Sequence, residues 1–212
     1  MNVRYAMSYS RPFLFDVIQE CLDANCTQLI ILPLYPQYAS STTGAVFDQV
    51  FKTLQGKRSL PALRIINSYY KHPAYIEALV QSVRTYWKDH TKPQKLLISF
   101  HGIPQNSVAK GDPYSIQCEA TAKALANALL LDQSEWQLVY QSRFGKARWL
   151  QPYCDKTLET LPAQGITDVQ VICPGFPIDC LETLEEIAKT NKQKFLDAGG
   201  KSYAYIPALN VS

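Results

Sequence analysis

His101 and a group of carboxylates around residue 182 are the side chains of this sequence best suited to chemistry. His101 directly follows the apolar run Leu96–Phe100, whereas His72 precedes Pro73 at a helix start and His90 lies in a charged stretch. An imidazole at the end of a buried strand can accept a proton, bind a metal ion, or serve only as a hydrogen-bonded structural group. For His101 these readings stay open on position alone, whereas His72 and His90 are predicted to be structural or solvated.

Three carboxylates, on Asp179, Glu182 and Glu186, are spaced so that a helix would place them on one face. The helix dipole favours acidic residues at a helix N-terminus, which explains the first two without any function. It explains Glu186, two turns into the helix, less well. One imidazole and one or more carboxylates form a nitrogen–oxygen site that suits ferrous iron or another first-row metal. Two protein ligands would hold the metal loosely, as transfer requires.

The hydropathy pattern predicts a parallel α/β scaffold for these side chains. Unbroken apolar strands alternate with helices whose apolar residues recur at i, i+3, i+4 and i+7. Strands are predicted at residues 3–7, 29–32, 64–66, 96–100, 137–141, 169–173 and 203–207. Helices are predicted at 12–22, 46–54, 73–88, 115–131, 154–163 and 179–196. This alternation predicts doubly wound, Rossmann-like parallel sheets covered by helices on both faces.

Two such domains are predicted, the first of them incomplete. Residues 1–72 would be the remnant of an N-terminal domain, 73–196 the C-terminal domain, and 197–212 a segment that returns toward the first domain. The first half offers only three strand candidates, and no closing helix follows the last extended segment. We therefore expect a chain that is truncated at the N-terminus and slightly at the C-terminus.

Ligands of open parallel sheets bind beyond the carboxyl ends of the strands. The loops expected at those ends carry hydroxyl and aromatic side chains, an arginine and a histidine. In chain order they are Ser8–Tyr9, Tyr35–Gly44, His101–Pro104, Ser142–Gly145 and Pro174–Asp179. The pocket is predicted between these loops.

Composition narrows the classes of function. Of the 212 residues, 47% are hydrophobic and 18% charged, as in a globular protein with a real core. A net charge of +3 with scattered basic residues gives no support for nucleic-acid binding. The sequence has no P-loop, no G-x-G-x-x-G after a strand and no G-x-S-x-G, so nucleotide cofactors and that type of hydrolase are unsupported.

The location predicted from the sequence is the cytoplasm. No apolar stretch reaches the roughly 20 residues that span a bilayer, and the N-terminus lacks a signal-peptide core. The six cysteines form no C-x-x-C pair. In the cytoplasm they should be reduced, and all except Cys180 are predicted to be small buried hydrophobic residues.

Several ordered motifs at the predicted strand ends resemble the ferrochelatase family. They are Leu34–Tyr38 with Ser41–Gly44, Ser99–Pro104, Gln141–Gly145 with Trp149–Leu150, Cys173–Ile187, and Tyr205–Asn210. The resemblance runs through nearly the whole chain, and the sequence is similar to the form of the family found in Gram-negative bacteria. It implies two parallel-sheet domains with a porphyrin cleft between them. It also implies insertion of Fe²⁺ into protoporphyrin IX to give protoheme, the terminal step of heme biosynthesis.

The same resemblance implies roles at the metal. His101 and Glu182 match the catalytic, metal-binding pair of the family. Asp179 and Glu186 match its polar helix facing the cleft, and we interpret them as a proton or metal relay. Cys180 stands where many relatives carry histidine, and we interpret it as a supporting residue rather than a redox centre.

Four further residues match substrate-binding positions of the porphyrin cleft, namely Tyr9, Tyr38, Arg143 and Trp149. The expected partners are protoporphyrin IX and ferrous iron, with iron as substrate and no tightly bound cofactor. Exposed aromatic side chains would also support peripheral membrane contact. Because the family's N-terminal segment is missing here, activity of this piece on its own does not follow from the resemblance.

Alternative functions stay open. The ligand set also suits a related chelatase that loads cobalt or nickel into a tetrapyrrole. A non-catalytic tetrapyrrole or metal carrier would use the same pocket without turnover. A purely structural doubly wound domain would leave the grouping of His101, Arg143 and the acidic helix without a cause.

Overall fold

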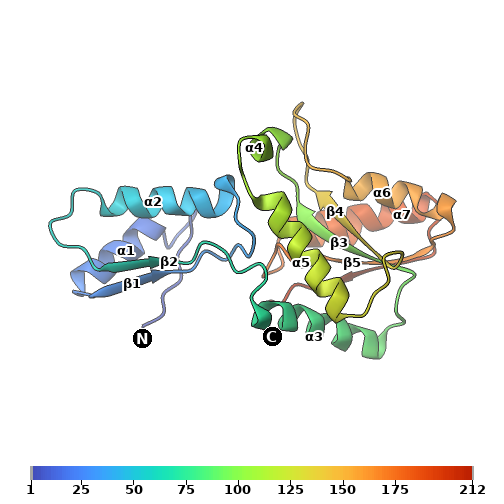
Figure 1. Ribbon diagram of the computed structural model, residues 1–212, viewed down its shortest axis with the longest axis horizontal. Helices are drawn as coiled ribbons and strands as arrows, with labels where there is room; N and C mark the ends of the chain where they lie inside the picture. Colours follow the sequence, from blue (N-terminus) through green and yellow to red (C-terminus); the bar gives the residue numbers. More distant parts are fainter. Residues whose placement is uncertain (1, 212) are drawn as a thin grey trace. The chain divides into compact units, whose positions relative to one another are not determined.

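The computed structural model describes residues 2–211, which divide into two units (Figure 1). The first unit extends to Ser68 and the second begins at Tyr69, close to the predicted boundary at residue 72. The described part of the predicted returning segment, 197–212, belongs to the second unit, where it adds a strand to the sheet. Within residues 2–211, no helix is long and apolar enough to cross a membrane.

The first unit contains a two-stranded parallel sheet. Its elements are α1 (Leu14–Asp23), β1 (Gln28–Ile31), the π-helix η1 (Ser40–Gly44), α2 (Ala45–Leu54) and β2 (Ala62–Ile65). The two strands pair with Gln28 opposite Ala62 and Ile31 opposite Ile65. Parallel pairing follows because the crossover through α2 returns the chain in the same direction.

Helices α1 and α2 pack on one face of this sheet. Their apolar stripes bury Ile18 and Val50, which lie in one cluster with Leu29 and Ile31 of β1. Side chains of a strand alternate between faces, so Ile30 points the other way, and it is 47% exposed. Among the described residues, the first sheet is therefore covered on one face only, whereas the sequence analysis predicted helices on both faces.

Residues 3–7 do not form the predicted strand. The Met7 N–H donates to the Pro12 carbonyl at 2.8 Å, and the Met7 carbonyl accepts from the Leu14 N–H at 3.0 Å. The backbone groups of Met7 are thus used by the turn that leads into α1, not by a neighbouring strand. For the same reason α1 begins at Leu14 instead of at Pro12.

The second unit is a four-stranded, wholly parallel sheet with the strand order β4-β3-β5-β6. Its strands are β3 (Lys95–His101), β4 (Trp136–Gln141), β5 (Asp168–Ile172) and β6 (Ser202–Ile206). Its helical elements are α3 (Pro73–Asp89), α4 (Gln105–Ala109), α5 (Tyr114–Ala128), α6 (Cys154–Thr160), the 3₁₀ turn η2 (Pro162–Gln164), the π-helix η3 (Glu182–Asn191) and α7 (Lys192–Asp197).

Helices cover both faces of the second sheet (Figure 1). On one face, Leu158 of α6, Ile187 of η3 and Phe195 of α7 pack on Leu97 and Val171 of the sheet. On the other face lie α3 and α5, which contact each other, β4 and β6. The prediction of a doubly wound α/β fold is confirmed here. The continuous burial of residues 96–100 of β3 explains why this segment is apolar except for Ser99.

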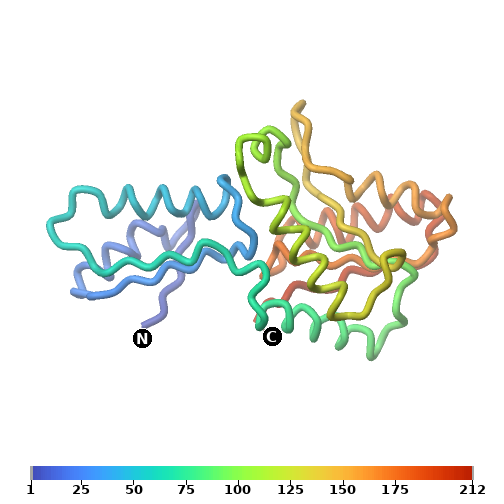
Figure 2. The backbone as a smooth tube through the Cα atoms, viewed as in Figure 1, coloured from blue at the N-terminus to red at the C-terminus, as the bar shows by residue number. Residues whose placement is uncertain are grey.

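Several of the predicted helices have different bounds in the structure, and the one predicted at 115–131 ends at Ala128. The helix predicted at 154–163 ends at Thr160 and is followed by η2. The helix predicted at 179–196 begins at Glu182 as a π-helix and continues as α7. The loop between β4 and α6, which carries Arg143 and Trp149, extends away from the sheet (Figure 2).

Candidate active site

His101 is the last residue of β3 and lies at the carboxyl end of the second sheet. Its register partner on β4 is Gln141, and the following N–H, of Gly102, donates to the Gln141 carbonyl at 2.8 Å. The ring Nδ1 lies 2.6 Å from the Gly102 carbonyl oxygen. A carbonyl can only accept, so Nδ1 carries the hydrogen and Nε2 is the unprotonated ring nitrogen in the neutral imidazole. That tautomer leaves Nε2 as the atom that can bind a metal ion or take a proton.

Aromatic rings flank the half-buried imidazole of His101. The ring centroids of Trp149 and Phe176 each lie 6.3 Å from that of His101. Gly102 makes this packing possible, because a Cβ there would lie 3.0 Å from the Gln141 carbonyl oxygen and 3.2 Å from the Trp149 ring. Trp149 is 6% exposed, and its indole N–H has no hydrogen-bond partner among residues 2–211.

Glu182 is the first residue of η3 and is half-buried. Its backbone carbonyl accepts a hydrogen bond of 3.1 Å from Nε2 of Gln141, the residue paired with His101. Beside it, burial and then the hydrogen bond to the Glu182 carboxylate raise the pKa of the Cys180 thiol. The structure thus brings His101 and Glu182 to the same end of the second sheet, with Cys180 as a neighbour of the carboxylate.

Asp179 is tied to the C-terminal part of the chain. Its carboxylate accepts from the hydroxyl of Tyr205 at 2.6 Å, from Thr183 Oγ1 at 2.9 Å and from Asn210 Nδ2 at 2.9 Å. Burial alone would raise the pKa of Asp179, but hydrogen bonds from Asn210, Tyr205 and Thr183 outweigh it and hold the pKa below its ordinary value. Asp179 is therefore a charged acceptor whose oxygens already have donors.

Glu186 is tied to the residue that follows β4. Its carboxylate accepts the backbone N–H of Ser142 at 2.8 Å and also the Ser142 hydroxyl. Of the three carboxylates predicted to share one helix face, Asp179 and Glu186 therefore have specific partners in the chain. Whether these two carboxylates relay protons or metal stays a prediction.

Arg143 lies on the exposed loop after β4. Its guanidinium forms an ion pair of 3.1 Å with Asp155, which also pairs with Lys194 at 3.1 Å, and it stacks 4.1 Å from the centroid of the Tyr153 ring. In this arrangement Arg143 faces α6 and α7, whereas its loop neighbour Trp149 contacts His101. A substrate-binding role for Arg143 stays a prediction.

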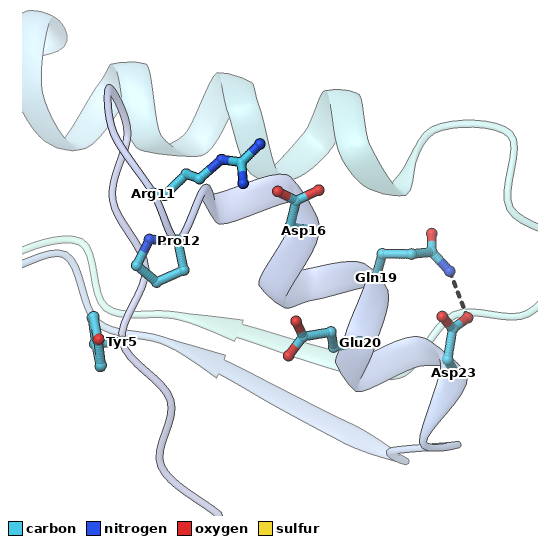
Figure 3. Close-up of a pocket in the computed structure, with 7 residues that line it drawn as sticks. All are labelled: Tyr5, Arg11, Pro12, Asp16, Gln19, Glu20 and Asp23. Carbon is cyan, nitrogen blue, oxygen red and sulfur yellow. Dashed lines mark hydrogen bonds between the residues drawn. The ribbon is translucent and has the colours of Figure 1, made fainter.

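Tyr9 and Tyr38, the other two predicted porphyrin contacts, belong to the first unit. Tyr9 is 81% exposed, and Tyr38 is half-buried with its ring 6.2 Å from that of Phe47. None of the predicted site residues lines a shallow depression of about 710 Å³ on the first unit (Figure 3). This depression is formed by Tyr5, Arg11, Pro12, Asp16, Gln19, Glu20 and Asp23.

The site contains residues to which the sequence assigned no role. Gln141 is 3% exposed and contacts Glu182, and Phe176 contacts His101. A glutamine at the end of an apolar strand is a detectable signal, because buried amides need hydrogen-bond partners.

Within residues 2–211 no group of three or more His, Cys, Asp or Glu side chains is placed to hold a metal ion. His101 with Glu182 remains the candidate pair.

The second unit is a parallel α/β fold with an imidazole and a carboxylate at the carboxyl end of its sheet, which defines a candidate metal-handling site of the chelatase class. The family model for ferrochelatase matches residues 1–212, and the chain belongs to the ferrochelatase family. It is 51% identical over 210 residues to the ferrochelatase of Methylococcus capsulatus and 54% identical over 211 residues to that of Hamiltonella defensa. It is 51% identical over 208 residues to a ferrochelatase of Yersinia pestis.

These matches cover 98–100% of this chain but only 64–66% of the relatives. The chain thus spans slightly less than two thirds of the length of the curated relatives that it matches.

Two solved structures share the fold. SirB from Bacillus subtilis with Fe³⁺ aligns with a TM-score of 0.63 at 14% identity, covering 95% of this chain and 72% of its own. CbiX, described as the terminal enzyme for biosynthesis of siroheme in denitrifying bacteria, aligns with a TM-score of 0.56 at 15% identity over 90% of this chain and 72% of its own. At these identities the likeness establishes the chelatase-type fold alone.

Proposed function

We propose that the protein inserts ferrous iron into protoporphyrin IX to form protoheme. The observation that carries the proposal is the 2.6 Å contact between His101 Nδ1 and the Gly102 carbonyl oxygen, from which we infer that Nε2 is the acceptor of the neutral ring. Glu182 supplies a carboxylate at the same end of the sheet. Membership of the ferrochelatase family and about 50% identity to ferrochelatases support the assignment.

Metal insertion needs an acceptor for protons and a ligand for iron. The two N–H groups of a flat porphyrin block its centre, so the ring must bend, and binding energy elsewhere on the ring has to supply the strain. In the proposal, His101 Nε2 accepts pyrrole protons or binds iron on one face. Glu182 binds iron or takes the released protons. Iron is the substrate, and no tightly bound cofactor is invoked.

Asp179 and Glu186 are proposed to relay protons or metal to this pair. Their charge supports the role, because each is a carboxylate next to Glu182 on or beside η3. Before the carboxylate of Asp179 or Glu186 can take up a proton or a metal ion, it must give up one of the hydrogen bonds that it accepts in the structure. The proposal therefore expects replacement of Glu186 to reduce turnover less than replacement of Glu182.

Tyr9, Tyr38, Arg143 and Trp149 are proposed to bind the porphyrin. The buried indole N–H of Trp149, which has no hydrogen-bond partner within residues 2–211, supports this, because a buried donor without a partner destabilises a protein unless a ligand satisfies it. Peripheral membrane contact is proposed from the exposed side chains of Phe144 and Leu181, each 72% exposed. Liposome co-sedimentation of wild type and a Phe144→Ser, Leu181→Ser variant tests that contact, and cell fractionation tests the proposed cytoplasmic location.

The test of function is Fe²⁺ and Zn²⁺ insertion into protoporphyrin IX, followed by the Soret band, with the Methylococcus capsulatus relative as positive control. We expect the His101→Ala variant to lose most of the turnover of the wild-type protein. Near wild-type turnover of that variant would remove His101 from the mechanism. Porphyrin binding without insertion would instead favour the carrier, and preference for Co²⁺ or Ni²⁺ in competition would favour the other chelatase.

A further inference from the structure

We propose that Gln141 is a positioning residue that holds Glu182 in place relative to His101. The inference rests on the proposed function, because it takes the imidazole and the carboxylate of those two residues as the acting groups. Gln141 itself is buried at the end of β4 and would not touch iron or porphyrin.

The side chain of Gln141 connects three parts of the second unit. Its Oε1 accepts from the Ser99 hydroxyl of β3 at 2.9 Å and from the Cys173 thiol, directly after β5, at 3.3 Å. Its Nε2 donates to the backbone carbonyl of Glu182 at 3.1 Å. Because Gln141 is also the register partner of His101, one residue contacts the backbone at both members of the candidate pair.

The chemistry of these partners fixes the orientation of the amide. The Glu182 carbonyl can only accept, so the amide nitrogen must face it. The hydroxyl and the thiol can donate to the oxygen on the other side. Every contact is therefore satisfied in one orientation, and the amide has no equivalent flipped state.

Ser142 supplies a second attachment between the end of β4 and η3. Its φ of 61° is a left-handed conformation that is strained for a residue with a side chain. The N–H and hydroxyl of Ser142 in that conformation both donate to Glu186. Glu182 and Glu186 are one helical turn apart, so η3 is attached to β4 at two successive turns, and Gln141 holds the turn that bears Glu182.

Loss of the Gln141 amide should therefore let the first turn of η3 move and misplace the Glu182 carboxylate. Residues that orient the ligands of a metal site without touching the metal change affinity or activity by about 10–100-fold when replaced. We expect a Gln141→Met variant, which keeps the volume but loses the bonds, to show a fall in kcat of about that size with the porphyrin KM unchanged.

Gln170 provides a matched control. It is 4% exposed, lies on β5 opposite Leu96 near the start of β3, and bonds Trp87 Nε1 at 2.8 Å and the Thr91 carbonyl at 2.9 Å. A Gln170→Met variant loses two part-buried hydrogen bonds toward the other end of the sheet, where Gln141→Met loses three. It should lose stability comparably while keeping the wild-type kcat.

A Gln141→Glu variant separates positioning from general destabilisation. The new carboxylate would still accept from Ser99 and Cys173, but it would face the Glu182 carbonyl with an oxygen that cannot donate. When protonated, the new carboxyl group can donate to that carbonyl, and burial favours the protonated form. The turnover of this variant relative to wild type should therefore rise as the pH is lowered.

Amide hydrogen exchange and Zn²⁺ affinity provide readouts that do not depend on turnover. If wild type inserts metal, the inference is supported by a selective fall in kcat for Gln141→Met, and overturned by wild-type kcat or by an equal fall in Gln170→Met. If wild type inserts no metal, the proposed function fails, and the inference is judged by exchange. Faster exchange of residues 182–187 and weaker Zn²⁺ binding in Gln141→Met alone support it, and unchanged values overturn it.

Discussion

The thiol of Cys180 lies beside the carboxylate of Glu182. That contact bears on whether the cysteine is a redox centre or a residue that supports the carboxylate. Reactive and redox-active cysteines have a lowered pKa, because nearby positive charge stabilises the thiolate. Burial and then the neighbouring Glu182 raise the pKa of Cys180 instead. A supporting role for Cys180 beside the carboxylate, as the resemblance implied, stays a prediction.

This reading predicts how Cys180 reacts. In the folded protein its alkylation by iodoacetamide should follow a pH profile with a midpoint above the ordinary thiol pKa of about 8.5. A Glu182→Gln variant should shift the midpoint down, because it removes the negative charge that disfavours the thiolate. Peptide mass spectrometry after timed alkylation measures both profiles. A midpoint below the ordinary value in wild type would show that Cys180 is an activated thiol.

Burial was predicted for the remaining five cysteines, and the structure buries three of them. Cys118, Cys154 and Cys173 are buried, as predicted, whereas Cys21 and Cys26 are half-buried. The last two flank the end of α1, where the N–H of Cys26 donates to the carbonyl of Cys21 at 3.1 Å. A helix end lies near the surface, so apolar neighbours in the sequence did not guarantee burial there.

At the scale of elements, the strand–helix alternation of the second unit was predictable because local hydrophobic periodicity encodes it. The start of the acidic helix was not. The spacing of the carboxylates placed Asp179 inside the helix, but its carboxylate is bound by Tyr205 and Asn210, which are 26 and 31 residues away in the sequence. Such long-range partners leave no periodic signal. The place of Gln141 at the end of an apolar strand was a detectable signal, but its partners were not, since they come from three separate segments.

The contacts of Asp179 predict a pH-dependent contribution to stability. An Asp179→Ala variant should destabilise the second unit by about 1–3 kcal/mol, because the part-buried hydrogen bonds from the Tyr205 and Thr183 hydroxyls to the carboxylate are lost. The pKa of Asp179 is lowered in the folded state, so its contribution is present above the unfolded pKa of about 3.9 and is lost as the pH falls through the folded value.

Urea unfolding of wild type and Asp179→Ala at neutral and acidic pH checks this prediction. The difference in unfolding free energy should be largest at neutral pH and should shrink below pH of about 4. Asp197→Ala is the control. This residue is exposed and its carboxylate accepts from Gln193 Nε2, so its replacement should change stability little. An equal difference between wild type and Asp179→Ala at both pH values would mean that the carboxylate's charge contributes nothing.

At the scale of the whole molecule, the two units differ in how much apolar surface they bury. The second unit has helices on both faces of its sheet, whereas the first has α1 and α2 on one face among the described residues. The opposite face exposes Ile30, at 47%. Stability scales with apolar burial, so the first unit of this chain should be the less stable one.

Hydrogen exchange and self-association test this difference together. Amides of β1 and β2 should exchange faster than those of β3 and β5, because local opening of a small core requires less free energy. An Ile30→Thr variant should lower self-association in analytical ultracentrifugation while changing stability by no more than about 0.5 kcal/mol, since the side chain is half exposed and threonine favours strands. Ile18→Thr, at a site 2% exposed, should instead destabilise the first unit strongly. Equal exchange rates in both sheets, or an Ile30→Thr variant as unstable as Ile18→Thr, would show that the open face of the first sheet is already buried in solution.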